Sequence, residues 1–126
     1  MGQAESLEKA AREKGYLEPD ESVGEYMLAK SGLPVEKGLK GGSAMFSRFA
    51  LLATDRNLHA LKLGQFGVKS IKERVLEVPI AEAQVKRSGN QIKVGRRGEK
   101  AARWVFTTAP YGSRAKKLVS YVDSHG

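Results

Sequence analysis

The chain lacks cysteine altogether and holds only two histidines. Without cysteine it can form no disulfide framework, no cysteine-ligated zinc site and no thiol nucleophile. His59 and His125 lie far apart in the sequence, and the motifs HExxH, GxSxG and GxxxxGK[ST] are all absent. Because no nucleophile is paired with a base, we predict a protein that is not an enzyme and that uses no cofactor and no metal.

Long apolar runs are absent as well. The longest, Phe49–Ala53, stops at Thr54, whereas a membrane-spanning helix needs about 20 apolar residues. The first 15 residues are too charged for the hydrophobic segment of a signal peptide. A length of 126 residues with 40% hydrophobic side chains suits one core. We therefore expect one cytoplasmic domain, peripheral at the membrane if its partner is lipid.

Positive charge is the main bias in composition. The chain has 22 basic and 14 acidic residues, a net charge of +8. Residues 1–20 carry −2, so the remainder carries +10, and residues 86–103 hold seven bases against Glu99 alone. Such a field attracts lipid headgroups, nucleic-acid phosphates or an acidic protein surface. A basic surface that serves only solubility is the alternative.

The two ends of the chain have helical patterns. Residues 3–15 combine i,i+4 charge pairs with a thin apolar stripe, which predicts a short helix that lies on the surface or frays. Residues 111–122 place apolar side chains at i, i+4, i+7, i+8 and i+11. Arg114, Lys116 and Lys117 fall on the solvent side of this segment. The pattern predicts an amphipathic helix that covers a core, in preference to one that lies on a membrane.

Between these helices the period changes to that of strands. Apolar stretches bounded by turn residues predict strands at 26–29, 45–54, 58–63, 68–71, 75–80, 91–94 and 102–107, with 84–86 as an extension of the fifth. Four glycines and a proline predict a long loop over 32–43. Pro79 favours an edge strand or a strand end. In the last strand, Trp104 and Phe106 share one face. His59 alternates with Leu61, which predicts a half-buried strand histidine.

This order of about seven short strands and a final helix resembles a pleckstrin-homology-like domain of the bacterial or GRAM type. The segment FSRFALLATDRNLHALKL at 46–63 is similar to its second and third strands, with Thr-Asp-Arg between them. The segment VPIAEAQV at 78–85 resembles a later strand. The resemblance implies a mainly β (β+α) fold, a partly open antiparallel barrel capped by the C-terminal amphipathic helix. Residues 1–21 would form an N-terminal helix and linker, and residues 22–126 the barrel with its helix.

The resemblance also implies a binding site. Pleckstrin-homology-like domains that bind phosphoinositides do so with basic residues at the end of the first strand, in the following loop and at the start of the second strand. The residues at these positions are Lys30, Lys37, Lys40 and Arg48. Arg96 and Arg97, in another hairpin, form a secondary basic patch. Solvated bases that contact nothing are the alternative for all of them.

We therefore expect a non-catalytic binding module that engages an anionic partner, most of all the headgroups of membrane lipids. A protein-interaction or homo-oligomeric assembly domain is the second hypothesis, because this fold hosts lipid, peptide and protein binders alike and because strand edges pair readily. The partner of a protein-interaction domain with this charge would be an acidic protein. Nucleic-acid binding is third. The GxxG turns at 38–41 and 95–98 fit a phosphate clamp, but both lie between predicted strands, not between helices.

Overall fold

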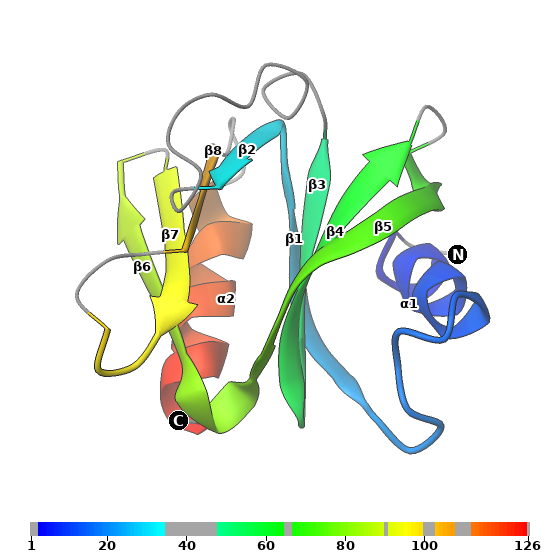
Figure 1. Cartoon of the computed structure of the whole chain (residues 1–126), viewed down its shortest axis with the longest axis horizontal. Helices are drawn as coiled ribbons and strands as arrows, with labels where there is room; N and C mark the ends of the chain where they lie inside the picture. The colour runs from blue at the N-terminus through cyan, green and yellow to red at the C-terminus, as the bar shows by residue number, and fades with distance from the viewer. Residues whose placement is uncertain are drawn as a thin grey trace.

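The computed structural model describes residues 3–34, 48–64, 67–89, 91–99, 103–107 and 112–125. Their strands form two four-stranded antiparallel sheets, with one helix near each end of the chain (Figure 1). In chain order the elements are α1 (Gln3–Glu13), β1 (Val23–Ala29), β2 (Ser31–Pro34), β3 (Phe49–Thr54), β4 (Asn57–Gly64), β5 (Gly67–Pro79), a 3-10 turn (Ile80–Glu82), β6 (Ala83–Ser88), β7 (Gln91–Arg96), β8 (Trp104–Thr107) and α2 (Gly112–His125).

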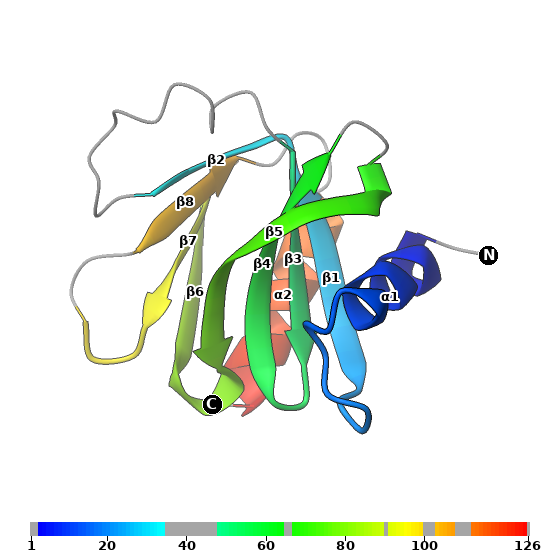
Figure 2. The ribbon, with the colours of Figure 1, turned by 45° about the vertical axis from the view of Figure 1, so that its right-hand side comes forward.

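The two sheets share one bent strand. The first sheet has the order β1-β3-β4-β5 and the second has the order β2-β8-β7-β6. Only Lys30 separates β1 from β2, so the first strand of the barrel contributes to both sheets. α2 packs against β6 and β1 and covers the space between the sheets (Figure 2). Seven antiparallel strands capped by a C-terminal helix form the predicted pleckstrin-homology-like barrel.

The interior of the barrel is filled from both sheets and from α2. The rings of Phe49, Trp104 and Phe106 pack together there, with centroids 5.4 to 5.6 Å apart. Three residues of α2 are fully buried in the same core: Ala115, Leu118 and Val122. The predicted covering face of the C-terminal helix and the shared inner face of Trp104 and Phe106 are both confirmed. Among the described residues, no helix is long and apolar enough to cross a bilayer.

A second core lies on the opposite face of the first sheet. Every residue of β3 is buried, because alternate side chains face the barrel and α1. Leu52 and Leu61 lie on the α1 side, where Leu7 and Ala11 meet them with no exposed surface. Figure 1 shows α1 across the first sheet from α2. The helix thus lies on the outside of the first sheet, the first of the two predicted alternatives, with its thin apolar stripe buried against the sheet.

Several element boundaries differ from those predicted. Residues 31–34 form β2 instead of a loop, because they pair with β8. The strands predicted at 68–71 and 75–80 are one strand, β5, whose register against β4 shifts at three places. Residues 84–86 belong to the separate strand β6, beyond the 3-10 turn. Pro79 ends β5 and β5 is an edge strand, as predicted.

The second core makes α1 part of the cooperative fold. We expect Leu7→Ala to lower the free energy of unfolding by about 2–4 kcal/mol, because Leu7 is fully buried. Lys9→Ala, on the exposed side of the same helix, should change it by less than about 0.5 kcal/mol. Urea denaturation followed by circular dichroism measures both. Equal, small effects would show that α1 contributes nothing to the stability of the barrel.

Candidate anion-binding surface

Lys30 and Arg48 lie at the same end of the first sheet. Ala29 and Phe49 are the last register pair between β1 and β3; Lys30 directly follows Ala29 in the chain, and Arg48 directly precedes Phe49. Both backbones are held by hydrogen bonds: the N–H of Lys30 donates to Thr107 at 3.0 Å, and the carbonyl of Arg48 accepts from Leu63 at 2.9 Å. Both side chains are exposed. We call this pair the basic rim.

The basic rim has no acidic partner within the described part of the chain. No carboxylate there forms an ion pair with Lys30 or Arg48. The other two predicted ligand-binding residues, Lys37 and Lys40, lie outside the described residues, so they stay predictions. Two of the four positions are therefore brought together, exposed and uncompensated.

Arg96 and Arg97 lie at the other end of the barrel. β7 starts with Gln91 opposite Thr107, which contacts Lys30, and it ends with Arg96. Arg96 pairs with Glu82 at 3.5 Å, and Arg97 donates to the carbonyl of Val122 at 3.4 Å. A guanidinium at that position favours the C-terminal end of α2. The GxxG sequence at 95–98 ends a strand and forms a turn, without the two helices that flank a phosphate clamp.

Arginine and lysine have different roles in the described part of the chain. The ion pairs there, apart from one with His59, all use arginine: Glu8–Arg12, Asp20–Arg56, Arg74–Glu77, Glu82–Arg96, Glu99–Arg103 and Glu25–Arg114. No lysine takes part in a described ion pair. The excess positive charge of the surface therefore comes mainly from lysines that remain available to an external anion.

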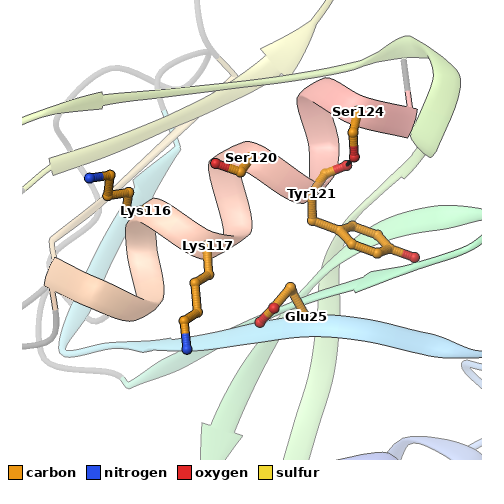
Figure 3. Close-up of a pocket in the computed structure, with 6 residues that line it drawn as sticks. All are labelled: Glu25, Lys116, Lys117, Ser120, Tyr121 and Ser124. Carbon is orange, nitrogen blue, oxygen red and sulfur yellow. Dashed lines mark hydrogen bonds between the residues drawn. The ribbon is translucent and has the colours of Figure 1, made fainter.

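A shallow groove of about 530 Å³ lies between α2 and β1 (Figure 3). The residues that line it are Glu25, Lys116, Lys117, Ser120, Tyr121 and Ser124. Burial raises the pKa of Tyr121, and the carboxylates of Asp55 and Glu25 raise it further, so its phenol stays neutral. Lys116 and Lys117 make this groove basic, but Glu25, which pairs with Arg114, places a carboxylate in its wall, unlike the basic rim. Its two walls are distant along the chain, so no local pattern of the sequence predicted this groove.

Two contacts shape this groove. A Cβ on Gly24 would lie 2.1 Å from the ring of Tyr121, so glycine is needed for the ring to pack over β1. Arg114 lies over the ring of Tyr26 at 4.4 Å and pairs with Glu25 at 3.6 Å. Arg114 is therefore half-buried, whereas the prediction placed it on the solvent side of the helix. Lys116 and Lys117 are exposed as predicted.

Glu21, Thr54 and His59 form a fully buried polar cluster between the linker and the first sheet. One carboxylate oxygen of Glu21, Oε2, accepts from the Thr54 hydroxyl and lies 2.9 Å from Nε2 of His59. The other, Oε1, accepts from the backbone N–H of Glu18 at 3.0 Å. Within the described residues Nδ1 of His59 has no partner. The prediction of a half-buried histidine was wrong, because α1 and its linker cover that face.

The Thr-Asp-Arg turn between β3 and β4 holds the linker in place. While Thr54 binds Glu21, Asp55 accepts from the N–H of Ser22 at 2.9 Å. Arg56 pairs with Asp20. Three consecutive turn residues thus contact three consecutive linker residues. The motif that carried the family resemblance has a structural role in this chain.

The same cluster brings a hydroxyl, an imidazole and a carboxylate together, as some hydrolytic sites do. Such a site needs a substrate within reach of its nucleophile. All three side chains are at most 1% exposed. The cluster is therefore closed to substrates in this conformation, and its hydrogen bonds stabilise the fold.

Comparisons with known proteins provide little beyond the course of the backbone. Neither a scan of protein families nor a search of curated proteins finds a match. Among solved structures, the chain is similar to the Slm1 PH domain, whose structure is a complex with D-myo-inositol-4-phosphate. The identity is 13% over 84% of this chain and 92% of that chain, with a TM-score of 0.46. A likeness of this size does not identify a ligand.

The Glu21 cluster predicts a specific acid sensitivity. Burial alone would raise the pKa of Glu21, but hydrogen bonds from His59 and Thr54 outweigh it and hold the pKa below its usual value of 4.5. The folded state therefore takes up this proton less readily than the unfolded state. The stability that Glu21 contributes is complete above about pH 4.5 and is lost as the pH falls through the lower folded pKa.

We expect Glu21→Gln to lower the free energy of unfolding by about 2–4 kcal/mol near neutral pH and to remove part of its decrease below pH 4.5. Chemical denaturation across a pH series measures both effects. Asp20→Asn is the matched control, because its ion pair with Arg56 is exposed; it should cost less than about 1 kcal/mol. An unchanged acid profile for Glu21→Gln would contradict the assignment.

Proposed function

We propose that this domain is a non-catalytic binding module that attaches to anionic membrane surfaces through the basic rim. The observation that carries the proposal is the position of Lys30 and Arg48 beside the last register pair at one end of the first sheet, both exposed and without an acidic partner among the described residues. Like charges side by side on neighbouring strands repel each other. An external phosphate would relieve that repulsion and gain charge-assisted hydrogen bonds.

The chain between β2 and β3 adds to this site. It carries Lys37 and Lys40, which the family resemblance assigns to the same site as Lys30 and Arg48. Each basic residue near an anionic membrane contributes about 1 kcal/mol. Four of them together would give a weak, reversible and salt-sensitive attachment, which suits a peripheral protein.

The distribution of charge favours binding by this end. At the other end of the barrel, the arginines at positions 56 and 96 are paired with Asp20 and Glu82. Arg97 at that end has no carboxylate partner among the described residues, so the compensation there is partial, whereas the basic rim has none. A protein with such an asymmetry turns its basic end toward an anionic surface before contact.

The edge strands favour this function over strand-to-strand assembly. β5 carries Lys72, Glu73 and Glu77, and β6 carries Lys86 and Arg87, all exposed. Charged residues on an edge strand disfavour pairing with a second chain. The barrel edges thus support a module that binds a surface in preference to a domain that assembles through its sheets.

Co-sedimentation with vesicles tests the proposal. We expect Lys30→Gln and Arg48→Gln each to weaken partitioning onto phosphatidylserine-containing vesicles about fivefold at low salt, with no binding to pure phosphatidylcholine. Arg96→Gln, at the opposite end and paired with Glu82, should have a much smaller effect. If all three variants lose affinity alike, the net charge and not the rim is responsible. If the wild type stays in the supernatant at low salt, the proposed function is wrong.

A further inference from the structure

The outer face of the second sheet carries two lysines directly opposite each other. Lys86 of β6 and Lys93 of β7 form a register pair, and both are exposed. Directly opposite side chains in an antiparallel pair have Cβ atoms about 5 Å apart, and like charges there are destabilising. The next residue across the sheet is Val105 of β8, which brings no charge to the row.

Nothing in the described part of the molecule compensates this pair. The neighbouring carboxylates along the chain, Glu82 and Glu99, are paired with Arg96 and Arg103. No described carboxylate forms an ion pair with either lysine. α2 packs on the inner side of this sheet, against Val85 and Val94, and α1 covers the other sheet (Figure 1). Within the described residues, neither helix covers this outer face and no carboxylate relieves the repulsion.

A glutamate at either position would convert the repulsion into a cross-strand ion pair and stabilise the hairpin. Natural sequences depart from the locally favourable choice mainly where a site has another task. The adjacent outward-facing side chains, Gln84, Gln91 and Thr107, are polar and uncharged. Val105, opposite Lys93, is apolar, but these three neighbours offer hydrogen-bonding groups, which suits contact with a hydrated anionic surface.

We infer that the Lys86–Lys93 pair is a second contact with the anionic membrane, separate from the basic rim. This inference rests on the proposed function for the identity of the partner. The two contacts lie toward the same end of the barrel, because Lys30 bonds to Thr107 and Thr107 is opposite Gln91, two residues before Lys93. The domain then docks on a corner, with the second sheet inclined toward the bilayer.

The aromatic side chains disfavour single-stranded nucleic acid at this face. Such binding relies on aromatic side chains on which bases stack. Trp104 and Phe106, the aromatic residues of β8, pack into the barrel core. The described lysines and amides of this face offer no aromatic ring on which a base could stack. They can, however, contact a layer of phosphate headgroups directly.

Lys86→Glu tests the inference, because stability and binding should move in opposite directions. The introduced carboxylate should pair with Lys93 and raise the midpoint of thermal unfolding by about 2 °C. Partitioning onto phosphatidylserine-containing vesicles should fall about 25-fold, since the local charge changes by two. Lys14→Glu is the matched control: it makes the same change of charge at an exposed site at the end of α1, on the far side of the molecule. Because salt screens a charge that lies more than a Debye length from the membrane, reversing this base should lower partitioning less than about threefold.

Three outcomes would overturn the inference. Equal losses for Lys86→Glu and Lys14→Glu would mean that only the net charge matters. Unchanged partitioning of Lys86→Glu, with losses for Lys30→Gln and Arg48→Gln, would leave the rim as the site and remove the second contact. A larger loss on duplex DNA than on vesicles at the same salt would make nucleic acid the partner. If Lys86→Glu loses partitioning while Lys30→Gln and Arg48→Gln keep it, the inference is supported and the proposed role of the basic rim is wrong.

Discussion

The carboxylate of Glu21 joins parts of the molecule that are far apart in the sequence. It accepts hydrogen bonds from β3 through Thr54 and from β4 through His59, while it stays out of contact with water. A buried charge is tolerated only where its partners are fixed. The linker must therefore have the same position against the first sheet in every folded molecule. This position places α1 on the sheet. Removal of the N-terminal segment would leave both an apolar face and two polar groups without their partners.

Covering the first sheet on both faces leaves the rest of the surface available for binding. α1 and α2 occupy the two sides of that sheet (Figures 1 and 2), so neither described helix covers the barrel end or the outer face of the second sheet. The basic rim lies at that end and the pair of lysines on that face. Packing explains why the basic residues lie on the uncovered surfaces, because the helices pack against the apolar surfaces of the sheets and not against the charged ones.

Local patterns predicted the barrel better than they predicted its contacts. The alternation in 102–107 and the helical spacing after 111 identified the inner faces, because those faces follow directly from backbone period. The packing of α1 against the first sheet was not predicted. Its apolar stripe has only two fully buried residues, and their contribution is evident only when the facing side of the sheet is known. The burial of His59 and the groove beside Tyr121 depend on residues that are distant along the chain. The basic rim could be proposed from the resemblance alone, but the repulsion between Lys86 and Lys93 required the register of β6 and β7.

Because the described ion pairs use arginine and His59 and no lysine, the surface charge of the domain and its stability can change independently. Lysine side chains can be acetylated, or replaced by glutamine during evolution, without breaking any of those pairs. The isoelectric point of the domain can then shift widely while its melting temperature stays nearly constant. Relatives of this chain could share the same barrel and linker, yet differ in the sign of their net surface charge.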